Sequence, residues 1–403
     1  MTDLSRAPTS KSQRRLISAC CAAHITQDGL SASIYIILPV LAQAFGFGYG
    51  QVGLVRATHS ACMWLLEIPS AMLSERLGER PLLVFGLLCA GAGYLCVAAA
   101  NGLSGIAVGL AIAGCGAAFQ HSLCSALIAR SFDSLSRRSA LGAYNSSGDI
   151  GKLTFTGILS LLLGVGVYWQ ALVVGYAVVA IVVAALIWHL LAKAHTAATD
   201  AVTPVAQEAL GWGIKHRAGF TVLAIIVFLD IAVQDGFFVF VTFVMLDKGV
   251  STGLAASAVV LTLIGGVLGK FALGRISMRF GIVATLIATQ CLTAIGIAVL
   301  WAAPAAYVLA VLPLLGIVLQ GSSTMTYGAV SELVSNERQS RGFAAIYTMA
   351  NGASIVGPIS FGLIGDQLGL SAALIGMGIV VLATVPLAFA LGYALRQLNT
   401  QKA

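Results

Sequence analysis

Charged side chains are scarce in this chain of 403 residues. Asp, Glu, Lys and Arg make up 9% of it, against about 25% in soluble domains. Hydrophobic residues make up 59%, and the mean hydropathy is +0.95. So few polar side chains cannot cover the surface of soluble domains of this total length. The composition therefore excludes a soluble protein and predicts an integral membrane protein.

Several kinds of functional motif are also missing from the sequence. The phosphate-binding pattern Gly-x-x-x-x-Gly-Lys-Ser/Thr does not occur, so ATP is not indicated as the energy source. The eight cysteines lie in apolar segments without the spacing of a zinc site, and we expect them to pack as small apolar residues. No motif pairs a nucleophile with a base. The sequence thus predicts no enzyme, no metal and no cofactor.

Twelve apolar segments are long enough to cross a bilayer, which takes about 20 residues. Six precede and six follow a polar linker at 193–217, in which we expect a short surface helix around 207–214. The predicted fold is an all-α membrane protein with six-helix bundles over 1–192 and 218–403. The spans are expected at approximately 16–45, 51–74, 81–100, 103–130, 138–165, 167–192, 218–246, 251–274, 282–302, 305–334, 341–365 and 370–395.

The net charge of +7 comes from Lys and Arg residues concentrated in particular loops. The loops after spans 2, 4, 6, 8 and 10 contain basic residues, those after spans 1, 3, 5, 9 and 11 contain none, and Lys248 after span 7 is the exception. Because Lys and Arg accumulate on the cytoplasmic side, we expect both termini in the cytoplasm and the protein in the cytoplasmic (inner) membrane. The basic residues therefore indicate membrane orientation and no nucleic-acid partner.

The two halves of the chain are related in sequence. Gln27-Asp28-Gly29 recurs as Gln234-Asp235-Gly236, an offset of 235 − 28 = 207. An offset of 203 relates further pairs, which are Gly78 with Gly281, Arg138 with Arg341 and Tyr144 with Tyr347. Two homologous apolar halves, each with an acid at membrane depth, are typical of a secondary transporter whose site lies near the bilayer midplane.

The loop after the second span carries a recognisable motif. The sequence Ala71-Met-Leu-Ser-Glu-Arg-Leu-Gly-Glu-Arg80 resembles the pattern Gly-x-Leu-Ala-Asp-Arg-x-Gly-Arg-Arg of the major facilitator superfamily. Ala71 replaces the first glycine, and in the second copy, at 274–281, Met278 replaces the acid. The resemblance implies a monomer and a cytoplasmic latch that stabilises the outward-facing state. The implied latch residues are Glu75, Arg76, Gly78, Arg80, Arg279 and Gly281.

A narrower resemblance lies in the first half. His24-Ile-Thr-Gln-Asp28 resembles the His-x-x-Asn-Asp of fosmidomycin-resistance-type efflux proteins, as do Gly114-Cys-Gly116 with His121 and Gly148-Asp-Ile-Gly151. The resemblance implies efflux by proton antiport. Ser122 stands in place of the proline of the fourth span, and Phe155-Thr156 in place of the Gly-Pro of the fifth. These departures leave open proton symport for uptake of an organic acid or a metallophore.

Ionisable side chains inside the spans are the candidate functional residues, because each costs about 2.5–3.5 kcal/mol to insert. His24 and Asp28 are one helical turn apart, and such a pair can bind and release a proton near neutral pH. The alternative is a static polar anchor between helices. Asp149 and Lys152 are also neighbours on one face. They form either a self-neutralising pair or a switch in which an anionic substrate competes for Lys152.

Further candidates lie in both halves. Asp230 and Asp235 face directions roughly 140° apart on one helix, so we do not expect them to share one site. Asp235, the repeat mate of Asp28, is the better candidate for the cavity, and Asp230 could pair with a neighbouring helix. Glu67 and Lys270 occupy equivalent repeat positions and could form either a state-dependent or a structural ion pair. The expected proton-coupling residues are Asp28, His24, Asp149 and Asp235. The expected substrate-binding residues are Lys152, His121, Gln27, Tyr144, Asp230, Lys270, Glu67 and Tyr347.

These observations predict a proton-coupled secondary transporter that moves a small organic solute or drug by alternating access. Buried lysines and histidines favour an anionic or zwitterionic solute, and efflux by antiport is favoured over uptake. The alternatives are a membrane-embedded enzyme, in which the buried His and Asp residues act as acid and base, and a non-transporting sensor. Neither explains two six-span repeats.

Overall fold

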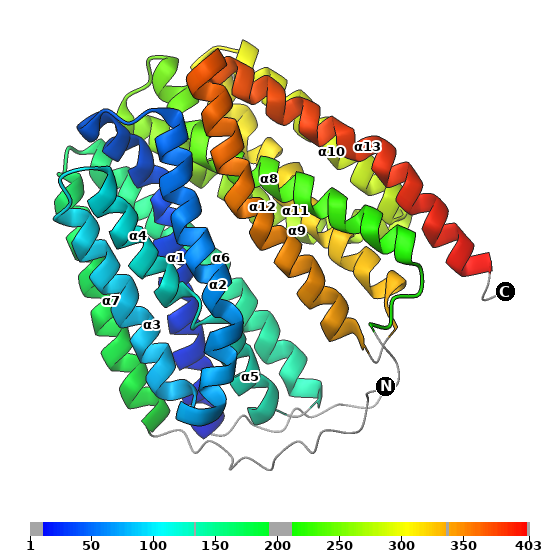
Figure 1. Cartoon of the computed structure of the whole chain (residues 1–403), viewed down its shortest axis with the longest axis horizontal. Helices are drawn as coiled ribbons and strands as arrows, with labels where there is room; N and C mark the ends of the chain where they lie inside the picture. Colours follow the sequence, from blue (N-terminus) through cyan, green and yellow to red (C-terminus); the bar gives the residue numbers. More distant parts are fainter. Residues whose placement is uncertain (1–10, 133, 193–211, 336–337, 401–403) are drawn as a thin grey trace. The chain divides into compact units, whose positions relative to one another are not determined.

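Nearly all the residues described by the computed structural model, 11–132, 134–192, 212–335 and 338–400, are helical (Figure 1). Apolar runs with few helix breakers produce this result, since long apolar segments satisfy their backbone only as helices in lipid. The helices are α1 (Lys11–Phe45), α2 (Tyr49–Leu77), α3 (Glu79–Ala98), α4 (Leu103–Ala117), α5 (His121–Ser131), α6 (Ser134–Gly164), α7 (Trp169–Ala192), α8 (Arg217–Asp247), α9 (Thr252–Phe280), α10 (Ile282–Ala302), α11 (Ala305–Leu333), α12 (Gln339–Leu368) and α13 (Leu370–Thr400).

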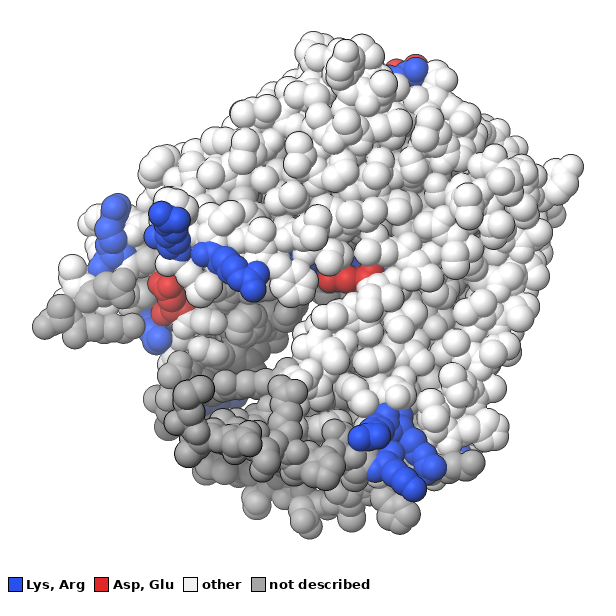
Figure 2. Space-filling view, turned by 180° about the vertical axis from the view of Figure 1, so that it is seen from behind, with Lys and Arg blue, Asp and Glu red and all other residues white. Residues whose placement is uncertain are grey.

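The expected all-α membrane fold is confirmed. Within the described residues, nine helical stretches are long and apolar enough to cross a membrane, and α4 and α5 count as one of them. The other three helices, α2, α6 and α12, have similar lengths and complete the twelve expected spans. On the face seen in Figure 2, charged side chains are few and most of the surface carries other residues.

The fourth span departs from the expected continuous helix over 103–130. Helix α4 ends at Ala117 and α5 begins at His121, with a turn between them. In this turn the backbone hydrogen bonds span three residues instead of four. The amide of Phe119 donates to the Gly116 carbonyl, and that of Gln120 to the Ala117 carbonyl. The hydroxyl of Ser70 donates to the freed carbonyl of Ala118 at 2.8 Å. The break places His121 at the first residue of a new helix.

The chain divides into two compact units near the predicted boundary. The first comprises 1–37 and 58–203, and the second 38–57 and 204–403, so the end of α1 and the start of α2 belong to the second unit. The predicted linker falls mostly outside the described residues, including 207–211 of its expected surface helix. The described remainder of that helix is not helical, because Ile214 forms a bridge with Val334 instead.

Each unit has its own apolar core. In the first, buried side chains of α1, α3, α5, α6 and α7 pack together around Leu16, Leu123 and Tyr144. In the second, side chains of α8, α11, α12 and α13 pack around Leu223, Leu333 and Leu391. The second unit also contains a charged contact, in which the carboxylate of Asp366 accepts from the amides of Tyr49 and Gly50 at 2.6 and 2.8 Å. The first amides of a helix have no acceptor within that helix, so the carboxylate of Asp366 caps α2.

The structure preserves the duplication seen in the sequence. Gly78, between α2 and α3, has φ +78°, and its repeat mate Gly281, between α9 and α10, has φ +87°. Both lie in the left-handed region that only glycine enters at little cost. The offset of 203 residues therefore relates equivalent turns in two six-span repeats.

Candidate functional site

The candidate site begins with two side chains of α1. Nε2 of His24 lies 3.3 Å from Oδ2 of Asp28, four residues later on the same face. This is the pairing that the helical spacing predicts. The side chains are only 6% and 11% exposed, so both polar groups are held inside the first unit.

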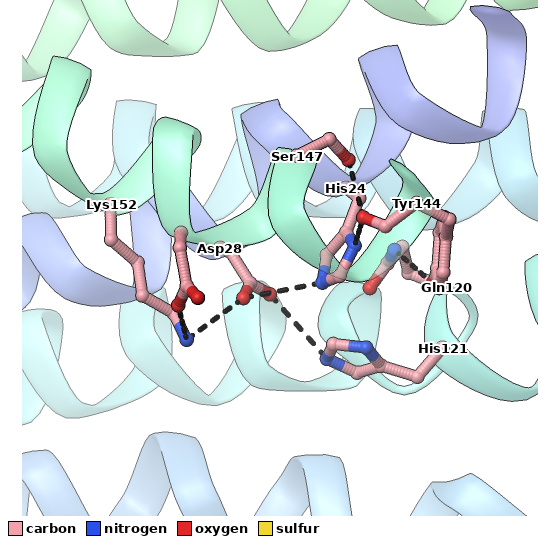
Figure 3. Close-up of polar contacts among 8 residues, drawn as sticks. His24, Asp28, Gln120, His121, Tyr144, Ser147 and Lys152 are labelled. Atoms are coloured by element: carbon pink, nitrogen blue, oxygen red, sulfur yellow. Dashed lines mark hydrogen bonds and ion pairs between the residues drawn. The ribbon is translucent and has the colours of Figure 1, made fainter. Parts of the chain in front are cut away.

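Asp28 is also the meeting point of two more distant residues (Figure 3). Nζ of Lys152 in α6 lies 3.1 Å from Oδ2, and Nε2 of His121 in α5 lies 3.5 Å from Oδ1. The partners are more exposed than the carboxylate, at 34% for Lys152 and 39% for His121. An anion arriving from the open side would therefore meet these two groups before it met Asp28.

Lys152 is shared by two carboxylates. Its Nζ lies 3.8 Å from Oδ1 of Asp149, the pairing expected from the spacing of three residues, but it lies closer to Asp28. The helical spacing predicts two separate pairs, His24 with Asp28 and Asp149 with Lys152, whereas the structure joins them into one group. With neutral histidines, this group has one positive and two negative charges.

A second layer of contacts orients His24. Its Nδ1 lies 2.8 Å from the carbonyl oxygen of Tyr144, and its ring stacks on the Tyr144 ring at 4.3 Å. Gln120 donates to the Tyr144 hydroxyl at 2.7 Å. Because Tyr144 is almost completely buried, this geometry favours a positioning role over the predicted contact with substrate.

Glycines of α6 allow this helix to approach α1. A Cβ atom at Gly148 would lie 2.4 Å from Nε2 of His24 and 2.9 Å from Oδ2 of Asp28. A Cβ atom at Gly151 would lie 2.2 Å from the carbonyl oxygen of Ile25. The Gly148-x-x-Gly151 spacing thus leaves the space that the charged group occupies.

The second unit buries an acid of its own in α8. Asp230 accepts a hydrogen bond from Nε2 of Gln290 in α10 at 2.8 Å and one from the hydroxyl of Ser322 in α11 at 2.7 Å. Both carboxylate oxygens are therefore bonded to neighbouring helices, as expected for an acid that ties helices together. Its predicted role in substrate binding stays a prediction.

We expect Asp230→Asn to destabilise the protein. Asparagine replaces one acceptor oxygen with a donor nitrogen and removes the charge, so the bonds from Gln290 and Ser322 to a carboxylate are lost, and a hydrogen bond to a charged group contributes about 1.5–3 kcal/mol. Thermal unfolding of the purified protein in detergent measures the change. Asp247→Asn, at the exposed end of α8, is the matched control and should unfold like the unmodified chain. An unchanged unfolding temperature for Asp230→Asn would contradict the bonding scheme.

The remaining expected substrate and coupling residues are dispersed. Gln27 is buried in α1, and Asp235 is half-buried in α8. Tyr347 of α12 is 47% exposed, with its ring 5.4 Å from that of Tyr327 in α11. Glu67 belongs to the first unit and Lys270 to the second, and their pairing stays a prediction.

The expected latch residues lie at the turns between helices. Glu75 and Arg76 are exposed near the end of α2. The guanidinium of Arg80 lies 3.7 Å over the ring of Trp188 and donates to its carbonyl, while Glu79 pairs with Arg130. In the second copy, Arg279 lies 5.3 Å from the ring of Phe280. The structure thus ties α3 to α5 and α7 here, and the latch function stays a prediction.

Comparison with known proteins places these features in a wider group. The model of a family described as Major Facilitator Superfamily matches the chain twice, over residues 20–221 and 222–401. Among curated proteins, an uncharacterized transporter of Buchnera aphidicola subsp. Schizaphis graminum (strain Sg) is 32% identical over 88 residues. That match covers 21% of this chain and 22% of the relative's length.

Solved structures resemble nearly the whole chain. A bacterial homolog to the human lysosomal transporter Spinster, inward-facing and unoccupied, has a TM-score of 0.81 at 13% identity, covering 97% of this chain and 99% of that one. A mutant of the nucleoside transporter NupG has a TM-score of 0.76 at 15% identity, covering 94% and 99%. At these identities the likeness concerns the fold.

Proposed function

The chain belongs to the major facilitator superfamily, and from that premise we propose that it is a proton-coupled secondary transporter of a small organic anion or zwitterion. The observation that carries the proposal is the buried carboxylate of Asp28 bound to the partly exposed ammonium of Lys152 at 3.1 Å. A buried charge of this kind inside a membrane span is costly to keep and marks a functional site.

The proposed mechanism is a competition for Lys152. An anionic substrate binds the exposed side of the ammonium and weakens its attraction to Asp28. A proton that reaches Asp28 neutralises the carboxylate and leaves Lys152 to the substrate. Nε2 of His24 faces Asp28 at 3.3 Å and can exchange that proton with it, while the Tyr144 carbonyl holds the ring in place. Alternating exposure of the site to the two sides of the membrane then couples the two movements.

The direction of transport is proposed as efflux by antiport, as the His24–Asp28 and Gly148–Gly151 motifs favour. The alternative is symport for uptake of an organic acid or metallophore, which the same lysine would serve equally well. We further propose, on the basis of its loop charges, that the protein lies in the cytoplasmic membrane with both termini in the cytoplasm. A monomer is proposed from the resemblance to the family alone.

Proton flux in proteoliposomes with a trapped pH dye tests the proposal. Small anions, amphipathic drugs and metal chelates are added one at a time. A substrate-dependent pH change supports coupling, and its sign separates antiport from symport. If compounds that bind the protein in a thermal-shift assay produce transport without any pH change, proton coupling is refuted.

Lys152→Ala should reduce affinity for an anionic substrate by about ten- to a hundredfold, because a hydrogen bond between charged groups contributes about 1.5–3 kcal/mol. Binding is measured by titration calorimetry over a series of anions and matched neutral analogues. Lys215→Ala, which removes an exposed lysine outside the site, is the control. Equal affinities for the anion series in Lys152→Ala and the unmodified chain would place the anion site elsewhere.

A further inference from the structure

Three side chains of the site together form a possible metal-binding group. Among the described residues, His24, Asp28 and His121 form a group whose ligand atoms all lie within 4.8 Å of one another. Two imidazoles and one carboxylate suit divalent first-row transition metals such as Zn²⁺, Co²⁺ and Ni²⁺. The sequence did not indicate the group, because His121 lies 121 − 28 = 93 residues beyond Asp28.

The orientation of His24 fits a metal ligand. Its Nδ1 faces the carbonyl oxygen of Tyr144, which can only accept, so Nδ1 carries a hydrogen. In the neutral ring, Nε2 then presents its lone pair toward the carboxylate of Asp28 at 3.3 Å. Two electron-rich atoms that face each other need a cation between them, either a proton or a metal ion. A backbone carbonyl behind the distal nitrogen is the usual outer partner of a metal-bound histidine.

The distances between the ligand atoms approach those of a coordinated ion. Ligand atoms around a tetrahedral ion are about 3.3 Å apart when each bond is about 2.0 Å long. Oδ2 of Asp28 lies 3.3 Å from the His24 nitrogen, and the other oxygen, Oδ1, lies 3.5 Å from the His121 nitrogen. With one ligand atom from each residue, the three atoms lie within 4.8 Å of one another, so a bound ion has to draw them together. Gly148 leaves the space beside these atoms, and the exposed side of His121 gives access for a further ligand.

The charge of Lys152 determines the form in which a metal could arrive. Its ammonium lies 3.1 Å from the same carboxylate, so a bare dication would be repelled. A metal ion bound to an anionic chelator removes the difficulty, because a chelator carboxylate can contact Lys152 while the metal contacts the histidines. This arrangement gives every charged group in the cluster an opposite partner.

We propose that His24, Asp28 and His121 bind a divalent transition-metal ion that arrives as a complex with a carboxylate chelator, and that Lys152 binds the chelator. The inference rests on the proposed transport function and names its cargo. The metal is cargo here and not a resident cofactor.

Metal binding is tested on the full chain, without a histidine tag, in detergent. Equilibrium dialysis against Co²⁺ with one equivalent of nitrilotriacetate should retain one Co²⁺ per protein, with a visible absorption band that differs from that of the free complex. His121→Ala and His24→Gln should weaken retention more than about tenfold, the effect already expected for losing an outer partner. His189→Ala, an exposed histidine of α7, should bind like the unmodified chain. Equal Co²⁺ retention in His121→Ala, with normal thermal unfolding, would overturn the site.

The chelator is tested with radiolabelled nitrilotriacetate. The unmodified protein should retain it only when Co²⁺ is present, and Lys152→Ala should retain Co²⁺ while losing the chelator. If the unmodified protein is supplied with both and retains Co²⁺ but not nitrilotriacetate, the proposed chelate is overturned and the ion alone is the ligand.

Binding in detergent needs no gradient, so it is separate from the transport test. Failure to bind Co²⁺ in a protein that still moves protons with another solute would refute this inference alone. Binding of the Co²⁺ complex with no transport in proteoliposomes would support the site and refute the proposed function.

Discussion

Asp28→Asn is expected to abolish substrate-dependent proton movement while leaving the protein folded. Asparagine matches the shape of aspartate but carries no charge, so Lys152 loses its nearest partner, at 3.1 Å, and the histidines lose theirs. Removing one member of a buried ion pair costs about 3–5 kcal/mol. Asp149 still lies 3.8 Å from Lys152, so we expect the cost in folding stability at the lower end of this range. Proton coupling is lost because asparagine cannot bind and release a proton.

The measurement is the dye-reported proton flux in proteoliposomes, at equal amounts of reconstituted protein. Asp247→Asn removes an exposed acid at the end of α8 and should leave the flux unchanged. Thermal unfolding in detergent checks that both variants are folded. Full coupled flux in a folded Asp28→Asn protein would exclude Asp28 as the coupling acid.

Gly148→Ala is expected to disable the same site by adding a single carbon atom. The new Cβ would lie 2.4 Å from Nε2 of His24 and 2.9 Å from the carboxylate of Asp28, so one of these groups must move. Overpacking of this kind costs about 1–3 kcal/mol, more than the gain of about 1 kcal/mol from alanine in a helix. We expect transport to fall by about tenfold or more, because displacement of either group breaks the contacts with Lys152 and Tyr144.

Gly157→Ala is the matched control, because Gly157 lies in the same helix and a Cβ atom there meets no other atom within 4 Å. That variant should be at least as stable as the unmodified chain and equally active. Comparison of the two alanine variants isolates the clash from the change in helix propensity. Equal transport by both would mean that the charged group tolerates displacement.

The sequence predicted those parts of the site that depend on helical spacing. His24 with Asp28 and Asp149 with Lys152 are each within one turn, so their proximity follows from helix geometry alone. The contact of Asp28 with Lys152 spans 152 − 28 = 124 residues and depends on how α1 packs against α6. Gly148 and Gly151 indicate that α6 packs closely against another helix, but they do not identify that helix as α1.

The repeat predicted the fold better than the site. Gly78 and Gly281 form equivalent turns, as the offset of 203 requires. The same offsets place Ile231 opposite His24 (24 + 207) and Ile355 opposite Lys152 (152 + 203), so the second half lacks the charged partners. Duplication conserves the helix packing that both halves need, whereas a single site needs its polar groups in one half only.

The break between α4 and α5 could not be predicted from hydropathy. The segment over 103–130 is apolar enough to span without interruption, and it contains no proline. At the interruption, the hydroxyl of Ser70 from another helix bonds the Ala118 carbonyl. A contact between distant segments cannot be inferred from local composition, and neither can the position of His121, 3.5 Å from Asp28.

The space at Gly148 has a genetic consequence. Every single-base missense change in a glycine codon introduces a residue with a Cβ atom, and here that atom would lie 2.4 Å from His24. No single-base missense change at codon 148 therefore avoids this clash. At codon 157, by contrast, an added Cβ atom has no contact within 4 Å. In a population exposed to a toxic compound that this protein exports, missense changes at codon 148 should therefore be lost more often than those at codon 157.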